Sequence, residues 1–356
     1  MKYFVFIIAF SLCLVSVFAQ NRITVQNGNQ TTFYTNLDSA IINSPSGATI
    51  LIPGGNWSIS GATTQIDKKL YIYGVGHYPD STKATGRTQI SGDVCFISGA
   101  DSSVISGIYI SGSLRFGTSS ANQKIKYLTI SRCNIKDSLK LGFEGNTEAQ
   151  NNLISECVLN TIIGFNQQNT VFDKNIINDN IRYFDNCKFN NNIFLKKRHD
   201  GNGLENRILV YINNCIFTDN VFLQESYYGF DCIVNHDGVS SFNNTFYNNL
   251  LTQNTTFPLP GNNVGLDNIV NVAQSDIFEN QTGSAFDYRH DYHLRSACPG
   301  KNAGLNGYDI GLYGTNVPYK EGAVPLVPHF IKADLAPEAT ANGMLKVTIE
   351  VEAQKR

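Results

Sequence analysis

The 356-residue sequence contains little charge, because Asp, Glu, Lys and Arg make up only 16% of it and the formal net charge is −2. Soluble domains are usually about one quarter charged. No run of five or more like charges occurs, so no part of the chain resembles a nucleic-acid-binding segment. Hydrophobic residues reach 42% and aromatic residues 11%, which excludes a disordered chain. We expect a well-packed protein with uncharged polar turns and no nucleic-acid partner.

Long apolar runs are lacking except at the N-terminus, where Lys2 precedes an apolar segment that extends to Phe18. Val17-Phe18-Ala19 resembles a signal-peptide cleavage site, and the apolar run is short for a bilayer. A membrane anchor is the alternative. We expect residues 1–19 to form a signal peptide cleaved after Ala19, and the mature chain, which has no predicted membrane span, to be secreted or periplasmic.

Cysteine is scarce and odd in number, since eight occur and seven remain once Cys13 leaves with the signal peptide. An odd number does not make a full disulfide framework. Four cysteines belong instead to a repeat: residues 186–195 and 214–223 superimpose at an offset of 28 residues, with Asn, Cys, Phe, Asn, Phe and Leu in register. Weaker copies give steps of 24, 30, 28 and 30 residues between Cys133, Cys157, Cys187, Cys215 and Thr245. A period in this range predicts a solenoid.

The repeat also lacks helix-length apolar spacing between residues 90 and 251, where apolar and polar residues alternate over three to five positions. Helical repeats are therefore excluded, and a β-helix with several short strands per coil is predicted. In this register residues 172–177 form a second strand on the coil that begins at Cys157.

Equivalent residues of successive coils stack at the strand spacing of roughly 4.8 Å, so the repeat also predicts interior columns. Cys133, Cys157, Cys187 and Cys215 are expected to form one column of buried thiols, with a metal or redox site as the alternative. Asn192 and Asn220 are expected to form an interior ladder whose amides bond turn backbone.

Both ends of the solenoid have candidate caps. Residues 35–42 predict a short amphipathic helix, with Leu37, Ala40 and Ile41 on its apolar face, that covers the first coil. Residues 345–352 alternate apolar and polar and predict a half-buried strand, paired near Phe330, that covers the last open edge. The predicted organisation is a signal peptide (1–19), a β-helix with its N-terminal cap (20–315) and a C-terminal tail with a capping strand (316–356).

The predicted helix, residues 49–52, the Pro53-Gly54-Gly55 turn and the Asn-rich coils resemble the pectin-lyase-like superfamily. Residues 291–294, 296–304 and 309–314 resemble the closing segment of secreted β-helix proteins of certain Gram-negative bacteria, a largely uncharacterised group. The resemblance implies an all-β fold, a right-handed parallel β-helix solenoid with an N-terminal capping helix and C-terminal capping strands. It also implies polysaccharide as the class of ligand, although Gly76-His77-Tyr78 is only a partial echo of the Gly-His-Gly motif of polygalacturonase-like enzymes.

One charged loop, residues 196–207, interrupts the neutral background. A lyase of uronate chains needs a cation to neutralise the sugar carboxylate and a base to remove a proton, and Lys197, Arg198 and His199 are side chains of those types. They are the candidate catalytic residues. A solvated loop without catalytic function is the alternative.

Other clusters give weaker predictions. Asp137 and Asp219 are placed at the same outward turn position without acidic neighbours on adjacent coils, which argues against a glycosidase. Asp231 and residues 235–238 offer oxygen ligands that suit calcium, with an Asx turn as the alternative. Residues 287–293 look metal-binding but are interpreted as end-cap packing.

Together these patterns predict a monomeric secreted β-helix that contacts glycans or other surface polymers along its flank. The alternatives are a polysaccharide lyase acting on acidic, uronate-containing glycans, and a structural or adhesin-like spacer. No cofactor other than calcium is indicated.

Overall fold

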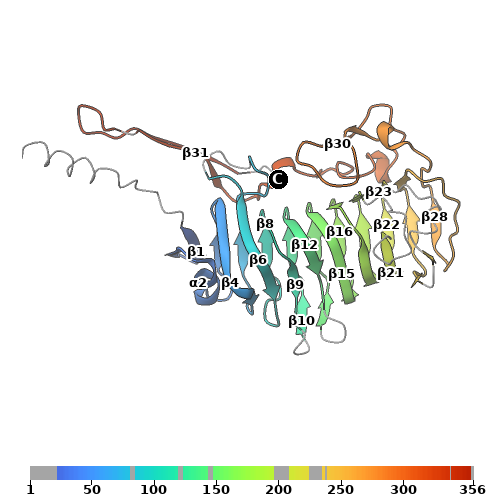
Figure 1. Ribbon diagram of the computed structural model, residues 1–356, viewed down its shortest axis with the longest axis horizontal. Coiled ribbons are helices and arrows are strands. Elements are labelled where there is room, and N and C mark those ends of the chain that lie inside the picture. Colours follow the sequence, from blue (N-terminus) through green and yellow to red (C-terminus); the bar gives the residue numbers. More distant parts are fainter. Residues whose placement is uncertain are drawn as a thin grey trace, which may run out of the picture.

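The computed structural model describes residues 22–80, 85–118, 123–142, 147–195, 208–223, 235–236, 239–336 and 338–353. In these residues the chain is mainly β, with two long and predominantly parallel sheets whose strands follow one another along a single axis (Figure 1). This arrangement is consistent with a β-solenoid.

Sheet 1, as we call the first sheet, begins with an antiparallel pair and continues with short parallel strands, each contributed by one coil. Most of these strands have three residues, and the middle residue points into the core. The strands in their order are β2 (Gln30–Tyr34), β1 (Ile23–Asn27), β3 (Thr49–Leu51), β5 (Tyr71–Tyr73), β7 (Val104–Ser106), β11 (Thr129–Ser131), β14 (Leu153–Ser155), β16 (Val171–Asp173), β19 (Lys188–Asn190), β22 (Ile216–Thr218), β26 (Thr245–Tyr247) and β28 (Val264–Leu266).

Sheet 2 supplies two further sides of each coil, one strand before the sheet 1 strand and one after it. Thus β21 (Leu209–Asn213) precedes β22, and β23 (Val221–Phe222) follows it. Its other strands are β4 (Gly55–Ile66), β6 (Thr88–Phe96), β8 (Tyr109–Ile110), β9 (Leu114–Phe116), β10 (Gln123–Lys126), β12 (Asn134–Lys140), β13 (Thr147–Gln150), β15 (Val158–Gln168), β17 (Ile176–Ile177), β18 (Ile181–Asp185), β20 (Ile193–Phe194) and β27 (Leu250–Leu251).

The core is an axial stack of the middle residues of the sheet 1 strands. Phe172, Phe189, Phe217 and Phe246 stand in register, and their ring centroids lie 4.7, 4.8 and 4.8 Å apart. The interplanar angles of 6–7° show that the rings lie face to face, at the spacing of neighbouring strands. Burial of these rings away from water is a main source of solenoid stability.

The predicted asparagine ladder is confirmed and is longer than the two residues named. The Asn220 Oδ1 atom accepts a hydrogen bond from the Asn192 backbone N–H at 2.9 Å, and its Nδ2 donates to Phe189 O at 2.8 Å. The same pattern extends along one column through Asn175, Asn192, Asn220, Asn249 and Asn268. Each amide therefore bonds to the turn backbone of its neighbouring coils.

The predicted single column of four cysteines is wrong. Cys133 and Cys157 stand three residues after the middle of their sheet 1 strands, in the column that continues as the asparagine ladder. Cys187 and Cys215 stand two residues before the middle of theirs, in a second column that continues to Asn244. All four are buried and form no disulfide, and the Cys157 and Cys215 sulfurs accept hydrogen bonds from the backbone N–H groups of Cys133 and Cys187.

The predicted step of 30 residues from Cys157 to Cys187 is also wrong, because these two cysteines occupy different columns. Residues 172–177 do not extend the coil of Cys157 but begin their own, since Phe172 pairs with Ile154 on one side and with Phe189 on the other. Equivalent positions on successive coils are separated by 25, 24, 18, 17, 28 and 29 residues from β7 to β26. The two short coils, of 18 and 17 residues, are therefore the ones from β14 to β16 and from β16 to β19.

The predicted N-terminal helix is confirmed as α2 (Leu37–Asn43), which lies at the β1 end of the sheets (Figure 1). Its N-cap Asn36 accepts a hydrogen bond from Ser39 N at 2.9 Å, and Leu37, Ala40 and Ile41 are buried. No helix among the described residues is long and apolar enough to cross a membrane.

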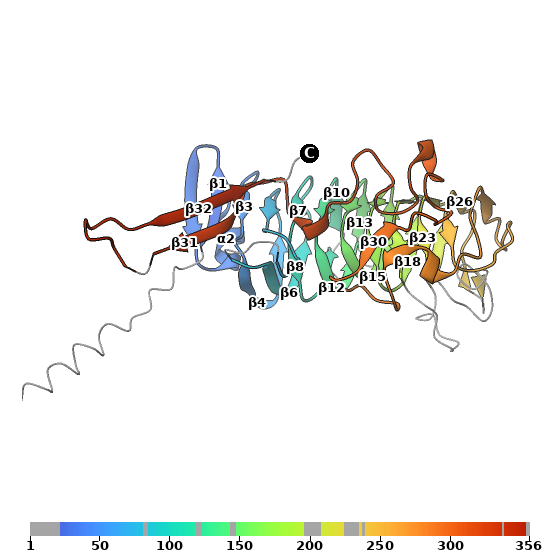
Figure 2. The ribbon, with the colours of Figure 1, turned by 90° about the horizontal axis from the view of Figure 1, so that it is seen from above.

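After β28 the chain turns back, and residues 277–328, which we call the strap, run along the side of the solenoid toward the β1 end (Figures 1 and 2). The strap begins with β29 (Phe278–Asn280) and β30 (Asp291–Leu294). Its apolar side chains pack on the outward residues of sheet 2, including Val158, Ile176 and Ile193. The expectation that residues 291–314 end the solenoid is therefore wrong, because they cover a flank whose outward residues are apolar.

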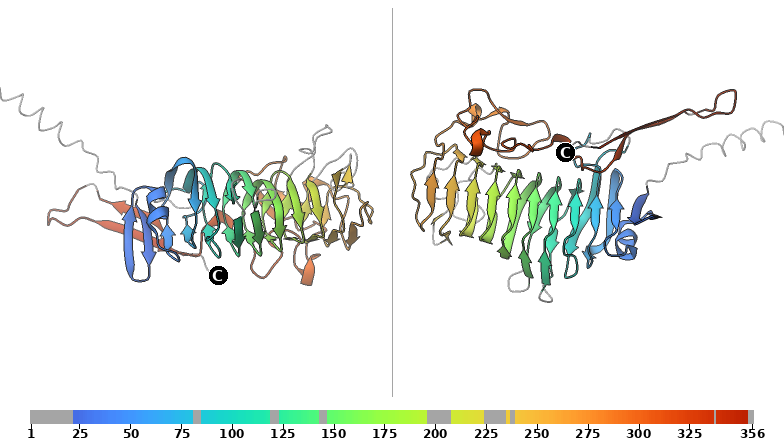
Figure 3. Two further views of the ribbon diagram at one scale, coloured as in Figure 1. Left: turned by 90° about the horizontal axis from the view of Figure 1, so that it is seen from below. Right: turned by 180° about the vertical axis from the view of Figure 1, so that it is seen from behind.

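The C-terminal strand is also placed differently from the prediction. β31 (His329–Leu335) and β32 (Val347–Glu352) pair antiparallel, with Phe330 opposite Val351 as expected. The hairpin extends away from the body at the β1 end, as Figure 3 shows, and Ile349 is 56% exposed. The expectation of a half-buried strand over the last open edge is wrong, because the strap carries the chain back along the solenoid before the hairpin forms.

Candidate functional site

The residues predicted to carry lyase chemistry, Lys197, Arg198 and His199, lie outside the described residues. So do Asp231 and Asp237 of the predicted calcium site, although β24 (Asn235–His236) pairs antiparallel with β25 (Val239–Ser240) beside it. Both sites stay predictions.

Asp137 and Asp219 do not share a turn position, which corrects the sequence alignment of these two acids. Asp219 follows β22 and has a left-handed backbone (φ 56°), as do its true equivalents Asn191 and Asn248. Asp137 lies within β12 of sheet 2, where its Oδ2 accepts a hydrogen bond from Ser113 Oγ at 2.6 Å. The neighbours of Asp219 on adjacent coils are amides, so no acid pair is formed there.

A groove that contains a row of polar side chains follows the outer face of sheet 1. Strands alternate the direction of their side chains, so when the middle residue of a three-residue strand is buried, its flanking residues face outward. The outward residue at the end of each strand is polar from β7 to β22: Ser106, Ser131, Ser155, Asp173, Asn190 and Thr218. The strap forms one wall of the groove.

The groove contains two hollows in line along the solenoid axis. The first, of about 530 Å³, lies over Ser106, Ser131 and Ser155 and is walled by residues 326–328. The second, of about 590 Å³, lies over Asp173, Asn190 and neighbouring residues and is walled by residues 315–317. They adjoin because β14 and β16 are hydrogen-bonded neighbours.

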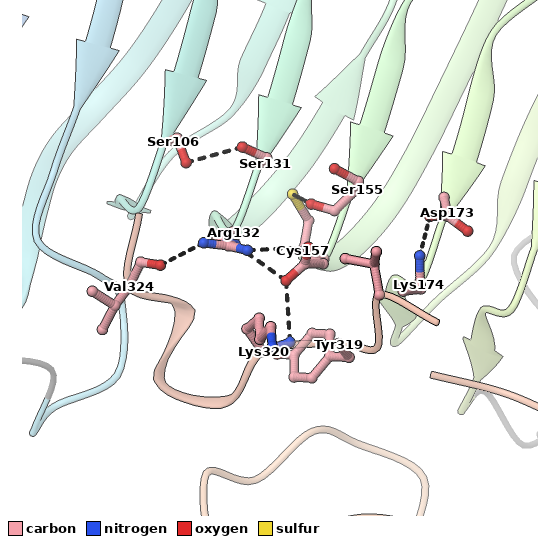
Figure 4. Close-up of polar contacts among 12 residues, drawn as sticks. Ser106, Ser131, Arg132, Ser155, Cys157, Asp173, Lys174, Tyr319, Lys320 and Val324 are labelled. Carbon is pink, nitrogen blue, oxygen red and sulfur yellow. Dashed lines mark hydrogen bonds and ion pairs between the residues drawn. The ribbon is translucent and has the colours of Figure 1, made fainter. Parts of the chain in front are cut away.

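A buried ion pair fixes the strap at the first hollow (Figure 4). Arg132 Nε lies 3.1 Å from Glu156 Oε2, and the two side chains are only 9% and 13% exposed. Arg132 Nη1 donates to Val324 O at 2.7 Å, while Glu156 Oε2 accepts from Lys320 N at 3.1 Å. Because each charged group bonds both its partner and the strap, the pair holds the groove wall in place.

The second hollow has a similar anchor at Asp219. Its Oδ1 accepts from Leu305 N at 3.1 Å, and its backbone oxygen accepts from Gly311 N at 2.9 Å. Burial raises the pKa of the Asp219 carboxyl, while the Leu305 N–H opposes the rise by stabilising the charged form. Lys174 Nζ, 2.6 Å from Asp173 Oδ2, neutralises the other carboxylate near this hollow (Figure 4).

The groove is therefore suited to hydrogen bonding rather than to acid–base chemistry. Its hydroxyls and the Asn190 amide offer donors and acceptors to a polyhydroxy chain. The Arg132–Glu156 and Lys174–Asp173 pairs compensate the charges at its walls, and Lys188 adds one exposed ammonium at the second hollow.

Within the part of the chain that the structure describes, one cluster could hold a metal ion. The ligand atoms of Asp291, His293 and Glu321 all lie within 4.8 Å of one another, on the outer surface of the strap. His293 Nδ1 is 2.7 Å from Asp291 Oδ1, and the His293 ring stacks on Tyr313 at 3.7 Å between centroids. The hydrogen bond and the ring stacking fix the position of His293 on the strap. The interpretation of residues 287–293 as packing and not as a metal site stays a prediction.

Sequence reasoning missed a buried polar joint between the first coils and the strap. Burial lowers the pKa of His77 to about 3, with the nearby Arg87 charge as a smaller cause. The Tyr288 hydroxyl lies 3.4 Å from His77 Nδ1, donates to His77 O at 3.2 Å and accepts from Asn134 Nδ2 at 2.9 Å. His77 is thus a neutral packing residue, and the His77–Tyr288 contact spans too much sequence for any local motif to reveal it.

Comparison of the sequence with protein-family models and with curated proteins finds no match.

Proposed function

We propose that the chain is a secreted right-handed parallel β-helix of the pectin-lyase-like kind, closed at its first coil by α2, that contacts glycans or other surface polymers through its flank. The observation that supports this proposal is the pair of adjoining hollows on the outer face of sheet 1, where a row of polar side chains lies among apolar ones. A long groove parallel to the solenoid axis suits an extended polymer better than a compact ligand. We further propose that it acts as a monomer.

The chemistry of the groove favours binding over cleavage. A hydroxyl-rich polymer can exchange hydrogen bonds with Ser131, Ser155, Asn190 and Thr218, whose side chains are partly exposed. Burial and backbone hydrogen bonds restrain the Asp219 carboxyl, and Asp173 is paired, so neither is placed as a free general acid or base.

The proposal is tested by affinity electrophoresis through gels that contain either a neutral β-glucan or polygalacturonate. Wild-type protein should be retarded by at least one polymer, and the double variant Asn190→Ala/Thr218→Ala should bind it roughly tenfold more weakly, as the loss of two hydrogen bonds implies. The double variant Asn27→Ala/Thr31→Ala is the matched control, because both residues are exposed on the β1–β2 hairpin, away from the groove.

Equal retardation of the two double variants would contradict the groove as the binding surface. Wild-type protein that no polymer retards, and that releases no unsaturated uronate from polygalacturonate, would contradict glycan contact altogether and favour a structural spacer.

A further inference from the structure

A third hollow lies on a different face, at the corner where strands β15, β18 and β21 of sheet 2 lead toward sheet 1. Three aromatic side chains from successive coils are stacked there: Phe165 on Tyr183 at 4.6 Å and Tyr183 on Tyr211 at 5.3 Å between ring centroids. The interplanar angles are 16° and 9°. All three residues are partly exposed, so the stack forms a ridge on the surface and is not part of the core.

The backbone of this ridge is unusual. Phe165, Tyr183 and Tyr211 have φ values of 44°, 61° and 54°, in the left-handed region that bulky side chains rarely occupy. The chain adopts this conformation at the same place on three consecutive coils, and the β15–β18 register shifts there. Such repeated strain must be maintained by the surrounding structure, and it turns the three rings outward.

The hollow beside the ridge has a volume of about 370 Å³. Its lining includes Gln167, Gln168, Tyr183, Asp185, Tyr211 and Asn213. It shares no lining residue with the sheet 1 groove.

One buried acceptor at this hollow is unsatisfied among the described residues. Gln167 is only 1% exposed, and its Nε2 donates to Ala149 O at 2.9 Å. Its Oε1, however, has no hydrogen-bond partner in the described part of the chain. A buried carbonyl oxygen without a partner is costly, so the site favours a ligand that brings a hydrogen-bond donor.

The remaining polar atoms point to the same kind of ligand. Asp185 is exposed and accepts one hydrogen bond, from Asn214 Nδ2 at 2.7 Å, which leaves its carboxylate with further acceptor capacity. None of the described lining residues carries a positive charge. A ligand with several hydroxyl donors and no negative charge therefore fits, whereas the Asp185 carboxylate repels an acidic sugar.

We propose that this hollow, which we call the tyrosine hollow, binds one unit of a neutral saccharide. The apolar C–H groups of the sugar contact the tyrosine ridge, and its hydroxyls donate to Gln167 Oε1 and Asp185. A ligand site with one aromatic wall and a few fixed polar groups is the usual composition of a small-molecule pocket. This inference does not depend on the sheet 1 groove.

Isothermal titration with cellotetraose, xylotetraose and mannotetraose, and with trigalacturonate as the acidic probe, tests the proposal. At least one neutral oligosaccharide should bind the wild-type chain more tightly than trigalacturonate does. Tyr211→Ala should weaken that binding at least tenfold. Asp185→Asn should reduce the difference in affinity between the neutral oligosaccharides and trigalacturonate.

Tyr127→Ala is the matched control, because Tyr127 is an exposed tyrosine with a similar φ of 61° that lies outside the hollow. Circular dichroism of each variant establishes that it is folded. The proposal is overturned if no neutral probe binds, if trigalacturonate binds most tightly, or if folded Tyr211→Ala binds as wild type does. If Tyr211→Ala no longer binds the oligosaccharide but is still retarded like wild type in the polymer gels, the tyrosine hollow and the sheet 1 groove are independent binding sites.

Discussion

Replacing Asn220 by Leu tests how far the buried asparagine ladder stabilises the fold. The side chain is fully buried, and its removal leaves the Asn192 N–H and the Phe189 carbonyl without their partners at 2.9 and 2.8 Å. Leu has the same number of side-chain heavy atoms as Asn and the same branching at Cγ, so the substitution removes the hydrogen bonds while keeping the shape of the side chain. Each buried group left unsatisfied costs about 1–3 kcal/mol, so Asn220→Leu should lower the free energy of unfolding by about 2–6 kcal/mol.

The measurement is equilibrium urea unfolding followed by far-ultraviolet circular dichroism. Asn268→Leu is the control, because Asn268 makes the same bonds to Phe246 and Asn249 at the partly exposed end of the ladder. Water can replace its amide there, so the loss should be clearly smaller. If the two variants lose the same stability, or if Asn220→Leu loses less than about 1 kcal/mol, hydrogen bonding in the ladder is not what stabilises the turn.

Two further predictions concern the strap. His77 has a folded-state pKa near 3, below its unfolded value of about 6.5, so its stabilising contribution is complete above pH 6.5 and is lost as the pH falls toward 3. Between neutral pH and about pH 5 the wild type should lose about 2 kcal/mol more stability than His77→Gln in urea titrations, and equal pH dependence would contradict a buried neutral His77. Arg132→Met leaves Glu156 buried without its partner and should cost about 3–5 kcal/mol, with faster proteolysis of the strap. Arg132→Met/Glu156→Leu should recover most of that loss, and a double variant as unstable as the single one would refute the ion-pair argument.

The repeating interior of this fold could be predicted from sequence, but its register was harder to assign. Asn192 and Asn220 were identified correctly because each follows its own sheet 1 strand at the same distance. The cysteines were aligned wrongly because each sheet 1 strand has one interior position before it and another after it. Cys or Asn occurs at both positions. Phe172 and Asn175 have the same spacing as Phe189 and Asn192. Aligning these two pairs reveals the 17-residue coil.

The side chains on the outer surface could not be predicted in the same way. Outward residues of successive coils lie above one another, but they do not have to pack together as the interior residues do, so no repeat is needed among them. Ser155 and Asp173 are structural equivalents although one side chain is a neutral hydroxyl and the other a carboxylate. The walls of the groove come from contacts such as Arg132 with Val324, which are 192 residues apart in the chain. Only the strand pattern is local, so the sequence indicates a solenoid without indicating which faces the returning chain covers.

The strap also changes how such a protein can come apart. Solenoids are usually held together by contacts between neighbouring coils, so they fray from an end one repeat at a time. Here one continuous segment is bonded to Asp219, Asn191, Glu156 and Arg132, which belong to four different coils. Opening an internal coil therefore strains contacts several coils away, which couples the stack into a larger cooperative unit. Because the strap follows the last coil in the chain, a growing polypeptide gains this long-range cooperativity only after every coil and the strap itself have been synthesised.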